Sequence, residues 1–185
     1  MDGCQEPDER LMLRVADGQR EPLDMLVRRY ATSLLTFIHR MVDDRHRAEE
    51  LFQEVFLTVW ARRRAYQFPR PFRAWLFGIA ARKCRAEHRR RTPWPVDFAD
   101  EARDPPPARD PSPLETAIAA ERGTLVAAAL TRLAAMPRAV VAMRIWSDLP
   151  YQEIAEALDC SESTVRVHMF RGLKEMRHYL EPRMR

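Results

Sequence analysis

Prolines divide this chain into two blocks. Six of the 21 residues from Thr92 to Ser112 are proline, and no apolar period runs through them. Because proline fixes φ and removes a backbone donor, no regular helix or strand can cross this stretch. We therefore expect a Pro-rich acidic linker at 92–112 that joins two small domains, at 1–91 and 113–185. Composition alone favours a disordered tether.

Both blocks show the apolar period of α-helices. In the first block, Asp8 is placed to cap a short helix that Gly18 ends, Pro22 opens a longer central helix, and a third helix follows. In the second block, a capping box at Ser112 precedes one helix and Pro137 opens another. We predict an all-α fold of two small helical domains, a helical bundle and a helix-turn-helix domain, joined by a flexible linker.

The stretch 149–180 predicts the helix-turn-helix. Pro150 presets φ for a short helix, Asp159 tolerates the left-handed conformation of a turn, and Ser161 is a favourable N-cap for a second helix. The inward residues of the second helix are Val165, Met169, Gly172, Leu173, Met176 and Leu180. Its outward residues are Ser163, Thr164, Arg166, Val167, Phe170, Arg171 and Lys174. Small polar residues followed by arginines suit a major-groove reader, and the competing interpretation is an ordinary helical hairpin.

The segment ARRRAYQFPRP at 61–71 combines cations with aromatic rings. Its arginines can neutralise phosphates, while Tyr66 and Phe68 either stack on unpaired bases or fold back onto the core. Pro71 then starts a fourth helix whose buried face carries Phe72, Trp75, Leu76, Ile79, Ala80 and Cys84. Six cations occupy its last ten residues, more than the helix dipole requires. We expect this end of the helix to track phosphates.

The third helix of the first block has an acidic, amide-bearing face. Glu49, Glu50, Gln53 and Glu54 lie beside an apolar stripe that runs from residue 48 to residue 60. Such a face is usually only solvated. The residues by themselves leave a solvated face and a binding face equally open.

Three motifs together resemble the extracytoplasmic-function (ECF) branch of bacterial RNA polymerase sigma factors. They are AEELFQEVFLTVW at 48–60, FRAWLFGIA at 72–80 and LPYQEIAEALDCSESTVRVHMFRGLKEM at 149–176. The resemblance implies sigma region 2 at 1–91, sigma region 4 at 113–185, and an alternative sigma factor that directs polymerase to promoters and helps melt the minus-ten element. The implied partners are promoter DNA, an anti-sigma factor, and the RNA polymerase core, through the clamp helices of its β′ subunit and the flap of its β subunit.

The same resemblance implies contact residues. Core docking is expected from Glu50, Leu51, Gln53, Glu54 and Phe56. The melted minus-ten strand is expected on the loop from Arg64 to Arg73 and the helix behind it, through Arg64, Tyr66, Phe68, Arg73, Trp75, Arg82, Lys83, Arg89 and Arg90. The minus-thirty-five element is expected on Ser163, Thr164, Arg166, Val167, His168, Phe170, Arg171 and Lys174. The sequence departs from the family at Arg82 and Ala86, where Asn and Asp are frequent, and at Pro150 and Ser163, where Ser and Gly are frequent.

Charge and cysteine spacing narrow the function further. The net charge is +4 overall and +6 over residues 1–91, which suits a nucleic-acid partner. Cys4, Cys84 and Cys160 form no C-x-x-C pair, so neither a disulfide framework nor a zinc knuckle is indicated. No apolar run reaches the ~18 residues of a membrane span. We expect a cytoplasmic protein that is not an enzyme and uses no cofactor.

Two rival functions remain at the level of sequence. STVRVH at 163–168 also fits the recognition helix of LuxR-like transcriptional activators, although residues 1–91 lack the alternating strands and helices of a receiver domain. The other rival is an enzyme or metal sensor built on Cys84 and His88, which lie one helical turn apart. Two ligands make only half of a zinc site.

Overall fold

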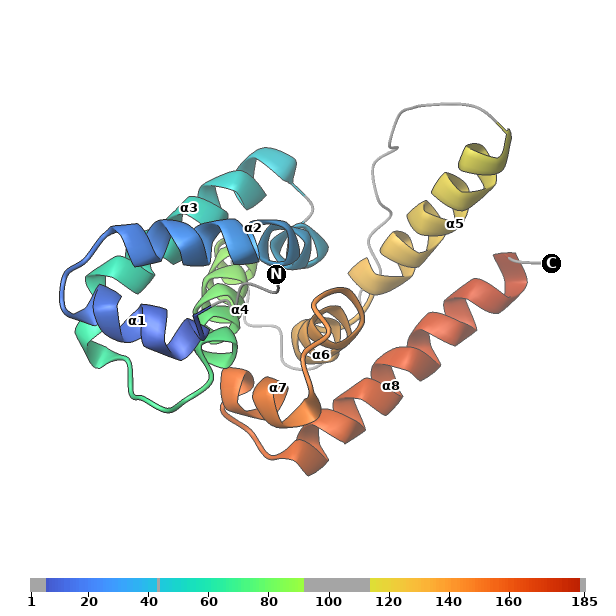
Figure 1. Cartoon of the computed structure of the whole chain (residues 1–185). Helices are drawn as coiled ribbons and strands as arrows, with labels where there is room; N and C mark the ends of the chain where they lie inside the picture. Colours follow the sequence, from blue (N-terminus) through green and yellow to red (C-terminus); the bar gives the residue numbers. More distant parts are fainter. Residues whose placement is uncertain (1–5, 43, 92–113, 184–185) are drawn as a thin grey trace, which may run out of the picture.

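Helices account for every regular element that the computed structural model describes. The description covers residues 6–42, 44–91 and 114–183 (Figure 1). The all-α class is therefore confirmed. The expected linker at 92–112 and the capping box at Ser112 lie outside the described residues.

The first two helices form an antiparallel pair. Helix α1 spans Asp8–Ala16 and α2 spans Glu21–Met41, with a proline in its first turn as expected. Gly18 follows α1 with φ +96°, a value that glycine reaches without strain. Asp8 is not the cap that the sequence predicted, because Pro7 holds the capping position. The carboxylate of Asp8 instead binds Arg29 and Tyr30 of α2, which ties the two helices together.

Helices α3 and α4 complete the first helical bundle. Helix α3 spans Arg45–Ala61, and its N-cap Asp44 accepts a hydrogen bond from the backbone N–H of Arg47 at 3.0 Å. A single 3₁₀ turn, η1 at Arg63–Ala65, leads through an irregular loop to α4, which spans Phe72–Arg91. All six residues predicted for the buried face of α4 are buried, and so are Ala74, Phe77 and Ala81. Buried residues therefore surround most of the first three turns of α4.

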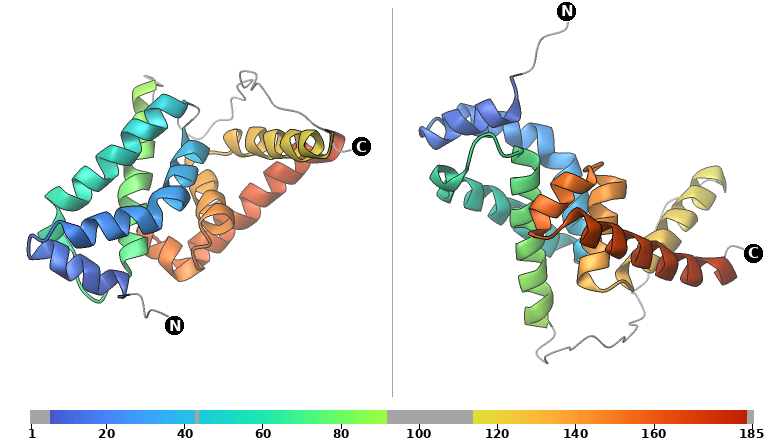
Figure 2. Two further views of the ribbon diagram at one scale, coloured as in Figure 1. Left: turned by 45° about the horizontal axis from the view of Figure 1, so that its top comes forward. Right: turned by 90° about the horizontal axis from the view of Figure 1, so that it is seen from below.

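The remaining helices belong to the C-terminal part of the chain. Helix α5 spans Leu114–Thr131, α6 spans Ala135–Trp146, α7 spans Tyr151–Leu158 and α8 spans Glu162–Leu180, followed by a 3₁₀ turn, η2, at Glu181–Arg183. Helix α6 begins two residues before Pro137, which a first helical turn tolerates because its N–H needs no partner. Figure 2 shows α5 and α8 side by side, pointing away from the other helices.

Helices α7 and α8 form the predicted helix-turn-helix. Asp159 ends α7 in the left-handed conformation, with φ 56° and ψ 52°. Ser161 caps α8 by accepting a hydrogen bond from the Thr164 backbone N–H at 3.2 Å. Val165, Gly172 and Met176 are buried as expected, but Leu173 is exposed. The prediction for Leu173 was wrong, because the helices that pack against α8 cover Gly172 and Met176 but leave Leu173 44% exposed.

The larger of the two apolar cores crosses the expected domain boundary. It joins residues of α1 to α4, such as Leu34, with residues of α6 and α7, such as Met143 and Ile154. A second, smaller core lies between α5, α6 and α8. Helix α4 packs directly against α7 and α2 packs against α6, so the two halves of the chain are in contact along an extended face (Figure 2).

Candidate nucleic-acid and protein interface

The acidic face of α3 is exposed but internally paired. Glu50 and Gln53 are exposed, whereas Leu51 and Phe56 are buried in the core. A single arginine forms ion pairs with two of these glutamates: the Arg47 guanidinium lies 2.7 Å from Glu50 and 3.0 Å from Glu54. A partner that binds this face therefore meets carboxylates that are already fixed in position.

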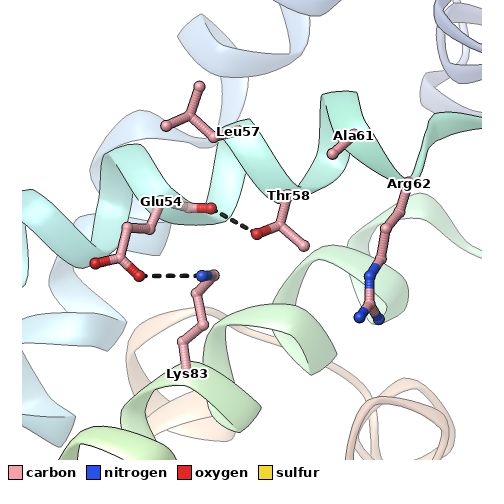
Figure 3. Close-up of a pocket in the computed structure, with 6 residues that line it drawn as sticks. All are labelled: Glu54, Leu57, Thr58, Ala61, Arg62 and Lys83. Atoms are coloured by element: carbon pink, nitrogen blue, oxygen red, sulfur yellow. Dashed lines mark hydrogen bonds and ion pairs between the residues drawn. The ribbon is translucent and has the colours of Figure 1, made fainter.

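Arg47 also bridges helices. Its Nε lies 3.0 Å from a carboxylate oxygen of Glu87 on α4, and Glu54 reaches the same helix through Lys83, with 3.0 Å between Nζ and Oε2 (Figure 3). Burial opposes ionisation of Glu54, but the hydrogen bonds and charges of Lys83 and Arg47 outweigh it and lower the pKa of this carboxyl. Glu54 is thus held ionised at the junction of α3 and α4. This junction was not predicted, because Arg47 and Glu87 are forty residues apart in the sequence.

An apolar groove of about 520 Å³ lies beside the acidic face, between α2 and α3. Its apolar lining is Leu23, Val27, Phe52, Phe56, Leu57 and Trp60. Leu57 is 67% exposed, although it lies in the middle of a well-formed helix. Leu57 was not predicted as a site residue, because it lies off the buried stripe of α3. The sequence did contain one signal for a binding surface here, because it places a leucine close to the glutamates of the acidic face.

The two aromatic residues of the loop behave differently. The Tyr66 side chain is only 8% exposed, packs edge-on against Phe72 and Trp75, and donates a hydrogen bond to the carbonyl of Arg70. Burial raises the pKa of the Tyr66 hydroxyl. Phe68 is 55% exposed. Of the two alternatives that the sequence left open, Tyr66 folds back onto the core and Phe68 presents a ring to solvent.

Arg82 of α4 lies within electrostatic reach of three other arginines of α4 and the loop before it. Partial desolvation, and then the charges of Arg62, Arg85 and Arg70, lower the pKa of the Arg82 guanidinium, so each of the three repels Arg82. A phosphate placed among them would relieve that repulsion. Arg64, Arg89 and Arg90 are exposed beyond this cluster.

The other residues expected to contact the minus-ten element are buried or form ion pairs within the protein. Trp75 is buried, and Lys83 binds Glu54 at the rim of a pocket that Leu57, Thr58, Ala61 and Arg62 also line (Figure 3). Arg73 pairs with Glu153 of α7, with 2.7 Å between Nε and Oε2 and 3.1 Å between Nη2 and Oε1. Its hydrogen bonds to Glu153 raise the pKa of Arg73.

The outward side of α8 is open to solvent. Phe170 is 71% exposed, and Arg166, Val167, Arg171 and Lys174 are exposed around it. The hydroxyls of Ser163 and Thr164 lie 2.7 and 2.9 Å from the Ser161 hydroxyl, so part of their hydrogen-bonding capacity is used at the N-cap. His168 is half-buried, and burial and then the charge of Arg171 lower its pKa. Helix α8 thus presents a cationic and apolar strip opposite its buried face.

The rival sites have less structural support. Cys84 is buried and burial raises the pKa of its thiol to about 12, while His88 is exposed. No three His, Cys, Asp or Glu side chains within the described ranges gather as a metal site would require. Across the same ranges, no helix combines the length and apolar character needed to cross a membrane.

Family comparisons agree with the two halves of the structure. The family described as Sigma-70 region 2 matches residues 26–93, and the family described as Sigma-70, region 4 matches residues 124–176. The first match covers most of α2 and all of α3 and α4, which carry the acidic face and the arginines. The second match includes all of α7 and all of α8 except its last four residues.

Curated relatives identify the branch. The ECF RNA polymerase sigma factor SigX of Bacillus subtilis is 30% identical over 169 residues, which cover 87% of this chain and 84% of SigX. The ECF RNA polymerase sigma factor SigE of Mycolicibacterium smegmatis is 33% identical over 157 residues, which cover 85% of this chain and 61% of SigE. The chain belongs to the ECF family of RNA polymerase sigma factors and is an alternative sigma factor that directs RNA polymerase. A LuxR-type activator is not favoured.

Two solved structures share the fold. The structure of CnrH in complex with the cytosolic domain of CnrY matches with a TM-score of 0.73 and 21% identity, covering 96% of this chain and 99% of CnrH. The sigma factor RpoE of Bartonella quintana, in complex with the anti-sigma factor NepR, matches with a TM-score of 0.65 and 18% identity, covering 88% of this chain and 98% of RpoE.

Proposed function

We propose that this sigma factor docks on the RNA polymerase core through α3 and the groove beside it. Glu50, Gln53 and Glu54 supply hydrogen-bonding and charged groups, and Leu57 and Trp60 line an apolar groove that a helix of the polymerase clamp can fill. An exposed apolar patch rimmed by polar residues is typical of a protein-binding surface. Leu51 and Phe56 support this surface from the core.

We further propose that the loop at 61–71 and the cationic side of α4 hold the melted strand of the minus-ten element. Phe68 offers an exposed ring on which a base can stack, and stacking contributes ~1–3 kcal/mol per base. The arginines around Arg82 supply phosphate contacts. Extruding a base costs a few kcal/mol, which contacts of these two kinds can offset without any covalent chemistry.

Helix α8 is the proposed reader of the minus-thirty-five element. The observation that carries the proposal is its outward side, where Arg166, Arg171 and Lys174 surround Phe170 while Val165 and Met176 anchor the opposite face. Arg binds guanine through two hydrogen bonds, and apolar side chains contact the thymine methyl group. A single helix-turn-helix binds DNA modestly, so tethering to the first domain and to polymerase supplies the rest of the affinity.

An anti-sigma factor is a further proposed partner. The Bartonella quintana RpoE structure contains the anti-sigma factor NepR, and the fold of that sigma factor matches this chain. The proposed place of action is the cytoplasm, where promoter DNA and polymerase are present.

Reconstitution tests the whole proposal. The full chain should co-elute with core polymerase from its own bacterium and permit initiation from a cognate promoter. Failure of both would contradict the function.

Substituting Gln53→Ala together with Glu54→Ala should weaken core binding about tenfold or more, because contacts at the centre of an interface carry most of its energy. Asp17→Ala, at an exposed carboxylate after α1 and away from this face, is the control and should bind like the unaltered chain.

Promoter binding by the reconstituted holoenzyme tests α8. Arg171→Ala should weaken binding to the upstream element by about 1–3 kcal/mol and relax base preference at one position. Arg177→Ala, an exposed arginine nearer the end of the same helix, changes the charge equally and should leave base preference intact. Equal effects of the two substitutions would mean that α8 contributes only general charge.

A further inference from the structure

Two neighbouring cations of α4 are turned to different surfaces. Arg82 lies within electrostatic reach of Arg62 and Arg70, at the two ends of the loop before α4. Lys83 is the next residue, and one step along an α-helix turns a side chain by about 100°. Lys83 is turned to α3 instead, where its Nζ lies 3.0 Å from Oε2 of Glu54 (Figure 3).

The Glu54 carboxylate is held at both of its oxygens. Oε2 meets Lys83 of α4, and Oε1 lies 3.0 Å from Nη1 of Arg47, two turns earlier in α3. Each carboxylate oxygen can accept more than one hydrogen bond, so both keep capacity for a donor from outside. The Glu54 side chain is 39% exposed, and a partner can therefore reach it while the two cations stay in place.

Arg47 extends this arrangement to Glu50 and fixes it to α4. Its Nη1 lies 2.7 Å from Glu50, and its Nε lies 3.0 Å from a carboxylate oxygen of Glu87. Glu87 is buried, so this last ion pair holds the guanidinium itself against α4. A lysine could not make the same contacts, because its single ammonium lacks the separate Nε and Nη donors of a guanidinium.

Carboxylates that are fixed beforehand bind a partner at a lower entropic cost. A glutamate side chain that becomes ordered only on binding loses its rotamer freedom at that moment. Glu50 and Glu54 are both held by ion pairs within this chain before any partner arrives. The cost of ordering them is therefore met on folding rather than on docking.

These ion pairs adjoin the apolar part of the proposed docking face. Leu57 lines the groove between α2 and α3, and it also lines the pocket of about 390 Å³ bordered by Glu54 and Lys83 (Figure 3). Leu57 and Glu54 are three residues apart on α3, so they are neighbours on the helix surface. A partner that covers Leu57 is thus brought next to the Glu54 carboxylate.

We propose that Arg47 and Lys83 are positioning residues for polymerase docking, and that they hold the carboxylates of Glu50 and Glu54 in the orientation that the polymerase binds. The inference rests on the proposed docking role of α3. It moves Lys83 from the minus-ten surface, where the sequence placed it, to the docking face. The polymerase supplies a further cationic donor, which uses the lone pairs that Arg47 and Lys83 leave open.

Affinity of the full chain for core polymerase tests this proposal. Lys83→Met removes the charge and keeps a long side chain, and it should weaken core binding about threefold, because Glu54 must then be ordered on docking. Arg47→Lys keeps the charge without the three contacts and should weaken binding at least as much. Arg10→Met, on an exposed arginine of α1, removes one positive charge elsewhere and should bind like the unaltered chain.

A double-mutant cycle shows whether Lys83 acts through Glu54. In a chain with Glu54→Ala the carboxylate is already lost, so adding Lys83→Met should not weaken core binding further. Binding of a fluorescent single-stranded DNA oligonucleotide of mixed sequence is measured with holoenzyme, at a core concentration that saturates each variant. Lys83→Met should leave this oligonucleotide affinity unchanged, since Lys83 is assigned to the docking face.

Three results would overturn the inference. Core binding by Lys83→Met that equals or exceeds that of the unaltered chain would show that Lys83 does not position Glu54. An equal loss with and without Glu54 would show that Lys83 acts by another route. Weaker oligonucleotide binding by the Lys83→Met holoenzyme would return Lys83 to the minus-ten surface.

The substitutions of Gln53 and Glu54 described above separate this inference from the proposed function. If their loss leaves core binding unchanged, α3 is not the docking face and the proposed function fails with the inference. If their loss weakens core binding while Lys83→Met and Arg47→Lys do not, only the positioning role fails. Lys83 and Arg47 lie on different helices, so a folding defect in one variant, seen as lost helical circular dichroism, leaves the other to decide.

Discussion

The environment of several single residues in this sigma factor could not be predicted from their residue type. Tyr66 and Phe68 are two positions apart in one loop, yet one ring is buried against Trp75 and the other is exposed. Glu54 is held ionised by Lys83 of another helix. The proposed roles of these residues in binding follow from such contacts rather than from their chemical type.

The two perturbed histidines predict a pH dependence of stability. Burial is the main cause that lowers the pKa of both His39 and His168, and nearby arginines add to it. Below their ordinary pKa of about 6.5, the unfolded chain binds protons that the folded chain does not. The free energy of unfolding should therefore fall as the pH drops below about 6.5 toward the lower pKa values of the folded state. Above pH ~6.5 these two histidines should change it little.

Urea unfolding at a series of pH values measures this effect. A variant with both His39→Gln and His168→Gln should show a flatter dependence between pH ~5 and ~7 than the unaltered chain. His88→Gln, on an exposed histidine of α4, is the matched control and should keep the original slope. The same slope in all three proteins would contradict the assignment of this pH dependence to His39 and His168.

At the scale of elements, caps and turns decide where the helices of the reader begin and end. Asp159 supplies the left-handed residue between α7 and α8, and Ser161 supplies the N-cap. Both were predicted from local chemistry and both are confirmed. The inward and outward sides of α8 were also predicted correctly except at Leu173, where the neighbouring helix decides burial.

Removing the α8 cap should destabilise the reader. Ser161→Ala leaves the Thr164 N–H without its side-chain acceptor and should cost about 1 kcal/mol in the free energy of unfolding. The control is Ser33→Ala, where the hydroxyl only donates to a carbonyl one turn earlier within α2, and a much smaller change is expected. Thermal unfolding monitored by circular dichroism separates the two, and equal losses would contradict the capping role.

At the scale of the whole molecule, one apolar core unites the two halves. Residues of α1 to α4 and of α6 and α7 belong to the same cluster, and α4 lies against α7 with Gly78 at the closest approach. Since the halves share buried surface, they should unfold together. Calorimetry of the full chain at low salt should show a single transition, and Gly78→Ala should lower its midpoint. Two resolved transitions in the unaltered chain would mean that the halves are independent.

Much of this protein could be predicted from the sequence. Helical period, prolines at helix starts and the turn at Asp159 depend on neighbours within a few residues, so they indicated the all-α class and the helix-turn-helix. The three motifs at 48–60, 72–80 and 149–176 indicated the family that the comparisons then confirmed. The residues assigned to promoter and polymerase contacts remain proposals.

Tertiary structure alone decided which charged groups are available. Arg47 with Glu87, and Arg73 with Glu153, are forty and eighty residues apart, and no local pattern links them. The groove beside Leu57 and the contact of Gly78 with Ala157 likewise depend on how separate helices pack. Local sequence determined the helices and their outward faces, because period and capping act over a few residues. Packing decided which of those faces are open and which are covered, because burial and ion pairing depend on distance in space.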